Sequence, residues 1–170
     1  MMPSGANQKR HSEKDFLLYS KIEENFNSAN LSVLDKLEAF PRFISKRSMA
    51  RFLCKYEIYK KIIEVPGNVV ECGVFTGAGL FTWAQLINIF EPANYTRKVI
   101  GFDTFEGFPS VNEKDNNEIT KPHIGELLGS TKKEMNKGIE KINLERHLSH
   151  ISNMELVEGV IIFIGAHFFV

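Results

Sequence analysis

The sequence predicts an α/β fold in which a partial parallel sheet is flanked by helices. Two apolar runs, at residues 69–72 and 98–102, have the near-continuous hydrophobicity of strands buried in a parallel sheet. Between them, apolar side chains recur every three or four positions over residues 78–90, as in a helix that packs on a sheet. A strand, a helix and a second strand in this order are typical of one half of a doubly wound sheet.

Helices are expected before the first strand. Aromatic and aliphatic residues recur at helical spacing over residues 13–27. A shorter helix should start near Val33 and end near Pro41, because proline interrupts helices. A third helix, over residues 45–64, is closed by a Pro-Gly pair. Its Tyr56 and Tyr59 could line an acceptor pocket, but an aromatic stripe of this kind is more often core, and we interpret them as core.

The chain is expected to divide into four segments. Residues 1–12 are polar and form a disordered N-terminus, 13–66 a helical extension, 67–159 the sheet domain, and 160–170 an atypical apolar tail. The tail is too short for a membrane span, which needs about 20 apolar residues, and no signal peptide opens the chain. Cys54 and Cys72 have no metal-like spacing, and Cys72 is expected to be buried in its strand. A cytoplasmic location without a membrane partner follows.

The charge balance argues against nucleic acid as a partner. The chain has 21 basic and 21 acidic residues, so its formal net charge is +0. Binding to a phosphate backbone usually needs a basic excess on one face. An incomplete sheet would expose a strand edge, through which a homo-oligomer could form.

The second half begins with a long loop. Residues 104–129 lose periodicity and are rich in glycine, proline and asparagine, which is usual for a functional loop. Thr131 and Glu134 then have the spacing of a capping box that opens a helix. A third strand is expected at residues 154–158.

A candidate cofactor site lies where the first strand ends. Glu71 lies at the end of the strand, Gly73, Gly77 and Gly79 follow it, and Asp103 ends the next one. Glycines allow a ligand to approach the backbone and the helix N-terminus, and an acid at the second strand can bind ribose hydroxyls. The alternative is a tight turn that has only a structural role and binds no ligand.

The nature of the ligand depends on the glycine spacing and on Glu71. The dinucleotide pattern G-x-G-x-x-G is absent, and a carboxylate at the strand end would repel a diphosphate. It could instead receive an amino group, directly or through water. S-adenosylmethionine has an amino group, a ribose and no phosphate, so it is favoured over NAD or a nucleotide sugar.

These segments resemble the macrocin O-methyltransferase family of class I S-adenosylmethionine-dependent methyltransferases. The resemblance rests on VVECGVFTGAG at residues 69–79 and on GFDTFEGFP at 101–109, and it covers about residues 40–159. It implies a Rossmann-like fold, of which 67–159 would be the N-terminal half. It also implies methyl transfer to a hydroxyl of a small molecule, in known members a sugar, with a divalent metal such as Mg²⁺.

The resemblance also assigns residues. Glu71 and the glycine loop would hold the methionine part of the cofactor, and Asp103 the ribose. The cofactor-binding positions carried over are Glu71, Gly73, Val74, Phe75, Gly77, Gly79, Asp103 and Thr104.

The chain departs from the family after Gly159. There the family continues with about a hundred further residues that supply the metal and catalytic groups, so we name no catalytic residue and no metal ligand. We expect a truncated and inactive form of the enzyme. The alternative is a non-catalytic fragment that binds cofactor or associates with another subunit.

Overall fold

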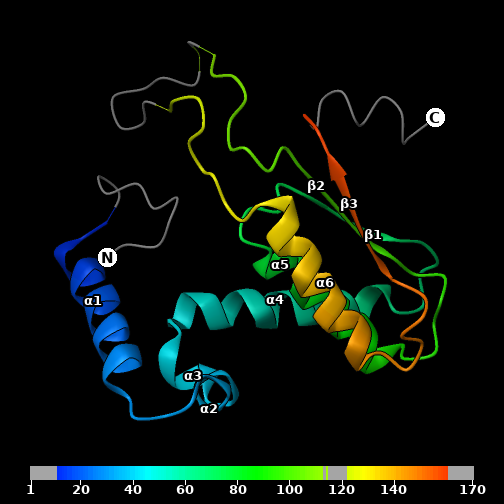
Figure 1. The fold of residues 1–170 in the computed structure, drawn as a ribbon, viewed down its shortest axis with the longest axis horizontal. Coiled ribbons are helices and arrows are strands. Elements are labelled where there is room, and N and C mark those ends of the chain that lie inside the picture. The colour runs from blue at the N-terminus through cyan, green and yellow to red at the C-terminus, as the bar shows by residue number, and fades with distance from the viewer. Residues whose placement is uncertain (1–10, 113, 115–121, 161–170) are drawn as a thin grey trace.

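A computed structural model describes residues 11–112, 114 and 122–160 (Figure 1). The expected disordered N-terminus and the apolar tail therefore lie outside the described residues, apart from their inner ends. Ser12, at the inner end of the first, is the N-cap of a helix.

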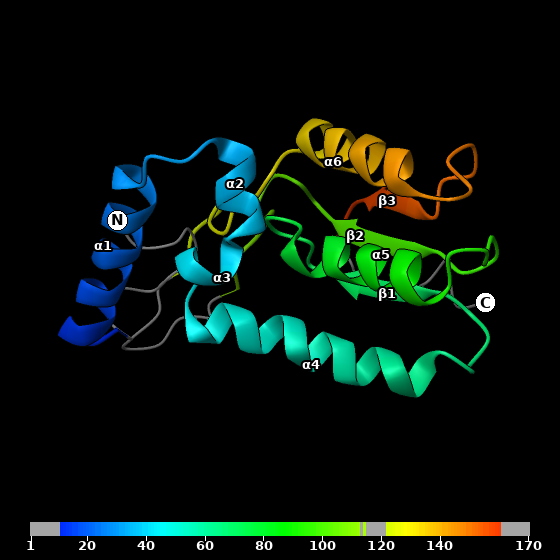
Figure 2. The same ribbon diagram turned by 90° about the horizontal axis from the view of Figure 1, so that it is seen from below.

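Four helices precede the sheet: α1 (Glu13–Ser28), α2 (Val33–Glu38), α3 (Phe40–Phe43) and α4 (Lys46–Ile62). Capping boxes start α1 and α2, with Ser12 paired to Asp15 and Ser32 paired to Asp35. Helix α2 ends at Glu38, before Pro41, as predicted, but Pro41 itself belongs to a further short helix. It lies in the first turn of α3, where its missing N–H is not needed. In both views α1, α2 and α3 lie together beside the amino end of α4, away from the strands (Figures 1 and 2).

The sheet confirms the predicted α/β class. Strands β1 (Val69–Cys72), β2 (Val99–Asp103) and β3 (Met154–Glu158) are parallel and lie in the order β1-β2-β3. They are connected by α5 (Ala78–Phe90) and α6 (Lys132–Glu145). Figure 2 shows α5 between α4 and α6, running along the strands. The capping box at Thr131 and Glu134 is present at the start of α6, as the sequence predicts.

The core lies between the sheet and these three helices. It joins Tyr59 of α4, Leu80 and Ile87 of α5, and Val99 of β2, which are almost fully buried. Tyr59 is thus a core residue, as interpreted from the sequence, and Tyr56 packs against the same cluster.

The prediction that Cys72 is buried is wrong, because its side chain is exposed. Side chains alternate along a strand, so Val69 and Glu71 share the face toward α5, while Val70 and Cys72 point to the other face. Within the described sheet β1 is also an edge strand. A strand that reads as apolar can therefore still expose one face.

Helix α6 approaches α5 closely at Gly138. An added Cβ at this position would meet the ring of Phe81, and an added Cβ at Gly77 would meet the same ring. The ring thus occupies space that a side chain at either glycine would take. The absence of a side chain at residue 138 allows the two helices to pack.

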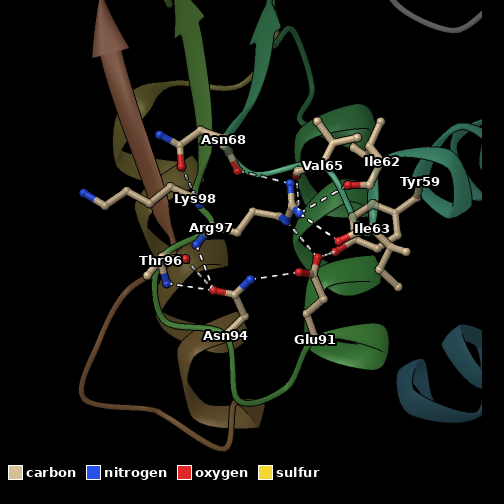
Figure 3. Close-up of polar contacts among 11 residues, drawn as sticks. Tyr59, Ile62, Ile63, Val65, Asn68, Glu91, Asn94, Thr96, Arg97 and Lys98 are labelled. Atoms are coloured by element: carbon tan, nitrogen blue, oxygen red, sulfur yellow. Dashed lines mark hydrogen bonds and ion pairs between the residues drawn. The ribbon is translucent and has the colours of Figure 1, made fainter.

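A buried arginine joins the amino end of the sheet to α4 (Figure 3). Arg97, which precedes β2, donates from Nη2 to the carbonyls of Ile62, Ile63 and Val65 at 3.2, 3.2 and 2.8 Å. Its Nη1 donates to the carbonyl of Gly67 at 3.1 Å. The last carbonyls of a helix lack partners within the helix. Arg97 donates hydrogen bonds to the carbonyls at the end of α4 and in the turn that follows.

Glu91, at the end of α5, neutralises this arginine. Arg97 Nε lies 2.8 Å from Glu91 Oε2 in an ion pair whose angle does not suit a hydrogen bond. Tyr59 donates its hydroxyl to the same oxygen, and Asn94 donates to Oε1 at 2.8 Å. Burial alone would raise the pKa of Glu91, but these hydrogen bonds and the charge of Arg97 hold it below its ordinary value. Burial, followed by the contact with Glu91, raises the pKa of Tyr59.

None of the helices within the described ranges is long and apolar enough to cross a membrane.

Candidate functional site

The predicted site residues meet at the carboxyl ends of β1 and β2. The two strands are in register, with Cys72 opposite Phe102, so the glycine loop that follows β1 lies beside Asp103. Gly73 continues the ladder by donating its N–H to the carbonyl of Phe102 at 2.8 Å. This is the edge at which ligands bind in doubly wound sheets.

The loop between β1 and α5 turns by placing three residues in the left-handed region. Gly73 has a φ of +80°, Phe75 of +53° and Gly77 of +85°. Glycine adopts this conformation without strain, whereas phenylalanine does not. Such strained residues persist only where their surroundings hold them, and they gather at binding sites.

Asp103 is the group that holds Phe75. Its Oδ2 accepts the N–H of Phe75 at 2.9 Å, and its Oδ1 accepts the N–H of Phe105, also at 2.9 Å. Phe105 is itself left-handed, with a φ of +57°. One carboxylate therefore fixes two strained backbone positions, one on each loop, and its orientation is set before a ligand arrives.

This arrangement leaves Asp103 able to bind more. A carboxylate has about four lone-pair positions, of which the two amides use two. The remaining two could accept the two hydroxyls of a ribose. The space in front of Gly73 is open as well, because an added Cβ there would meet nothing within 4 Å. The described residues thus fit an adenosine-bearing cofactor.

The amino end of α5 contributes unpaired backbone donors. Gly77 is the N-cap of α5. Because glycine has no side chain, no cap side chain accepts a hydrogen bond from the first N–H groups of the helix. These N–H groups and the helix dipole favour a negatively charged or polar ligand group.

Glu71 is placed differently from the other predicted residues. Its carboxylate lies against Gly79 in the first turn of α5. Its Oε2 accepts the indole N–H of Trp83 at 2.8 Å and lies 3.1 Å from the ammonium of Lys55 on α4. The structure thus brings Glu71 to the predicted edge, but with a positive partner already in contact.

The two remaining predicted residues have side chains directed to structural roles. Val74 is 3% exposed and belongs to the core, so only its backbone could face a ligand. Thr104 donates its hydroxyl to the carbonyl of Gly107 at 2.7 Å and thereby closes the turn after β2.

The described part of the long loop returns to the site. Phe108 donates its N–H to the carbonyl of Glu126 at 2.9 Å, and Gly125 donates its N–H to the carbonyl of Phe108 at 2.9 Å. Further on, Ser130 donates its N–H to the carbonyl of Phe75 at 3.0 Å. The segment before α6 is therefore fastened to both loops that carry the candidate site.

Sequence reasoning missed Lys55, Trp83 and the backbone role of Phe105, whose ring the sequence offers only as a possible stacking partner for adenine. The backbone contact of Phe105 had one detectable signal, because an aspartate two residues earlier can accept its N–H in an Asx-turn. Lys55 and Trp83 had none, since α4 and α5 approach Glu71 only through the tertiary packing. Their pairing depends on contacts over 16 and 12 residues of sequence.

The described residues do not fit a metal site. No group of three or more histidine, cysteine, aspartate or glutamate side chains within residues 11–112, 114 and 122–160 could hold a metal ion. We therefore derive no chemical step through a metal.

Comparison with known protein families finds no match. Comparison with curated proteins finds none either.

Two solved structures are similar to this chain. The first is that of CalS11, described as a calicheamicin methyltransferase; it has a TM-score of 0.79 and 24% identity, over 94% of this chain and 64% of CalS11. The second is the apo structure of CalS11, described as a TDP-rhamnose 3′-O-methyltransferase in calicheamicin biosynthesis; it has a TM-score of 0.70 and 23% identity, over 88% of this chain and 57% of that one. This chain thus spans less than two thirds of the length of the proteins it matches. At this level of identity the likeness establishes the fold, and the chain has the Rossmann-like α/β fold of these methyltransferases.

Proposed function

We propose that the chain is the cofactor-binding part of an S-adenosylmethionine-dependent O-methyltransferase of the macrocin type. The observation that carries this proposal is Asp103, whose two oxygens are oriented by the N–H groups of Phe75 and Phe105 beside the open space at Gly73. A preoriented carboxylate next to a glycine loop suits a ribose whose 5′ substituent runs along that loop. The Rossmann-like fold supports the same assignment.

Glu71 supports S-adenosylmethionine over a dinucleotide. In a dinucleotide site the diphosphate lies at the amino end of the helix after the first strand. Here the carboxylate of Glu71 lies against the first turn of α5 and occupies space that a diphosphate would need there. S-adenosylmethionine carries no phosphate and avoids this conflict.

We propose a hydroxyl of a small, sugar-type molecule as the methyl acceptor. CalS11 is described as acting on TDP-rhamnose, and the macrocin family methylates sugars in its known members. When bound, S-adenosylmethionine supplies an electrophilic methyl group to a hydroxyl that attacks it in line. The part of this chain in that reaction is to bind and orient the cofactor.

We further propose that these 170 residues contain neither the base nor the metal ligands that activate the hydroxyl. We also propose that the protein is cytoplasmic and homo-oligomeric, and that it binds neither nucleic acid nor a membrane. A second candidate function is a regulatory fragment that pairs with another subunit. It is favoured by β1, whose outer edge has no strand beside it within the described sheet.

The substitution Asp103→Ala tests the cofactor assignment. It removes the acceptor of the ribose hydroxyls, a loss of about 1.5 to 3 kcal/mol, so affinity for S-adenosylhomocysteine should fall roughly tenfold to hundredfold. Calorimetric titration measures this directly, with Glu106→Ala as a control because that side chain is exposed and three residues away. NAD should not bind the unmodified chain at micromolar concentration. Saturable NAD binding, or an Asp103→Ala chain with unchanged affinity, would refute the assignment.

A further inference from the structure

Lys55, Glu71 and Trp83 form a compact triangle between α4, β1 and α5. The ammonium of Lys55 is 3.1 Å from Glu71 Oε2 and 4.5 Å from the centre of the Trp83 ring. The indole N–H of Trp83 donates to the same oxygen at 2.8 Å. Each of the three side chains thus contacts the other two, which fixes the position of both charges.

The pair of charges alters what the site can attract. A lone carboxylate would attract any cation, but Glu71 with Lys55 beside it is close to neutral. Such a pair is complementary to a zwitterion, because the positive end of the ligand can approach the carboxylate while its negative end approaches the ammonium. The four charges then alternate, so that none is left without an opposite neighbour when water is displaced.

The pair is accessible and lies next to the glycine loop. The side chains of Lys55 and Glu71 are 25% and 16% exposed, so both are mostly covered but still reachable from solvent. Glu71 precedes Gly73 by two residues and lies against Gly79, at the other end of the loop. A cofactor whose ribose is bound at Asp103 would extend its other end along this loop toward the pair.

We infer that the Lys55–Glu71 pair recognises the zwitterionic amino-acid head of the cofactor. Glu71 receives the α-ammonium and Lys55 the α-carboxylate, which makes Lys55 a determinant of cofactor specificity. The inference rests on the proposed function, since it concerns the same ligand.

Two ligands separate the head from the rest of the cofactor. S-adenosylhomocysteine carries the amino-acid head, whereas 5′-methylthioadenosine keeps the adenine, the ribose and the sulfur but lacks it. Lys55→Met retains an apolar chain over Trp83 and removes only the ammonium. Lys60→Met is the matched control, because Lys60 lies on the same helix, pairs with Glu57 at 2.9 Å and stacks over Tyr56, away from Glu71.

Calorimetric titration of each chain with each ligand gives the test. Lys55→Met should weaken S-adenosylhomocysteine roughly tenfold or more while changing 5′-methylthioadenosine less than about twofold. Lys60→Met should change neither, and Lys55→Arg should recover most of the affinity for S-adenosylhomocysteine. Arginine keeps the charge that pairs with a carboxylate.

Several outcomes would overturn the inference. Unchanged affinity for S-adenosylhomocysteine would show that the carboxylate is held elsewhere, and increased affinity would show that Lys55 competes for Glu71. An equal loss for both ligands would show that Lys55 acts only by supporting the fold. If the unmodified chain bound neither ligand, the proposed function itself would fail, which distinguishes that failure from the others.

Discussion

Arg97 places a positive charge among the carbonyl groups that end α4 and lead into β1. Its side chain is 6% exposed and that of Glu91 is 11% exposed, so the ion pair is largely removed from water. A buried pair of this kind stabilises little against an apolar alternative, but losing one partner is costly because the other remains charged and buried. The carbonyls of Ile63 and Val65 would also lose this donor.

We therefore expect Arg97→Met to lower the free energy of unfolding by about 3 to 5 kcal/mol. Urea denaturation measures this, and the neighbouring residue provides the control. Lys98 pairs with Glu155 at 3.5 Å, but both side chains are about half exposed. Lys98→Met should change the same free energy by less than about 1 kcal/mol. Equal losses for the two substitutions would mean that the burial of Arg97 does not determine the loss of stability.

Single residues also show how far sequence could go at the site. Glu71 and Asp103 could be placed at one edge because the carboxyl ends of parallel strands coincide. What each carboxylate contacts could not be predicted. Asp103 binds the amide of Phe75 from a loop 28 residues earlier, and Glu71 meets a lysine from α4. Both contacts depend on how the elements pack, which hydrophobic periodicity does not encode.

Among the elements, α5 and α6 pack through the ring of Phe81. Gly138 would ordinarily weaken α6 by about 1 kcal/mol relative to alanine. The structure gives a reason for it, because a Cβ there would meet the ring of Phe81.

Gly138→Ala should therefore destabilise the chain by about 1 to 3 kcal/mol despite the better helix propensity. Asn136→Ala is the control, since that exposed position on the same helix gains propensity without a contact. Thermal unfolding of the two variants should shift in opposite directions. Stabilisation by Gly138→Ala would mean that α6 can move away from α5 at no cost.

The elements themselves were largely predictable, for a physical reason. The helices and strands carry strong local signals, and α5 begins and ends as its apolar pattern predicts. The end of α2 before Pro41 was predicted, but helix α3 was not, because proline at the start of a helix and proline after its end look alike in sequence. The prediction failed for Cys72 because periodicity identifies a strand without showing which neighbours cover each face.

At the scale of the whole molecule, the described residues assemble the groups that we propose to recognise a cofactor. A polypeptide of these 170 residues should bind S-adenosylhomocysteine and show no methyl transfer to a TDP-sugar. Positioning and activation of the hydroxyl account for most of the roughly 8 or more kcal/mol by which an enzyme lowers its barrier. Transfer of a radiolabelled methyl group measures this, with CalS11 on TDP-rhamnose as the positive control. Turnover close to that of CalS11 would contradict the proposal and place the activating groups within this chain.

Arg97, with the carbonyls that it binds, lies at the amino end of β2, and the loops at Asp103 lie at its carboxyl end. In a cell, substitutions at the amino end should therefore change how much folded protein accumulates, because a loss of stability exposes the chain to proteolysis. Substitutions at Lys55, whose side chain is still reachable from solvent, should change abundance less and mainly alter ligand affinity. Natural variation in this protein can thus be sorted by the end of the sheet on which it falls.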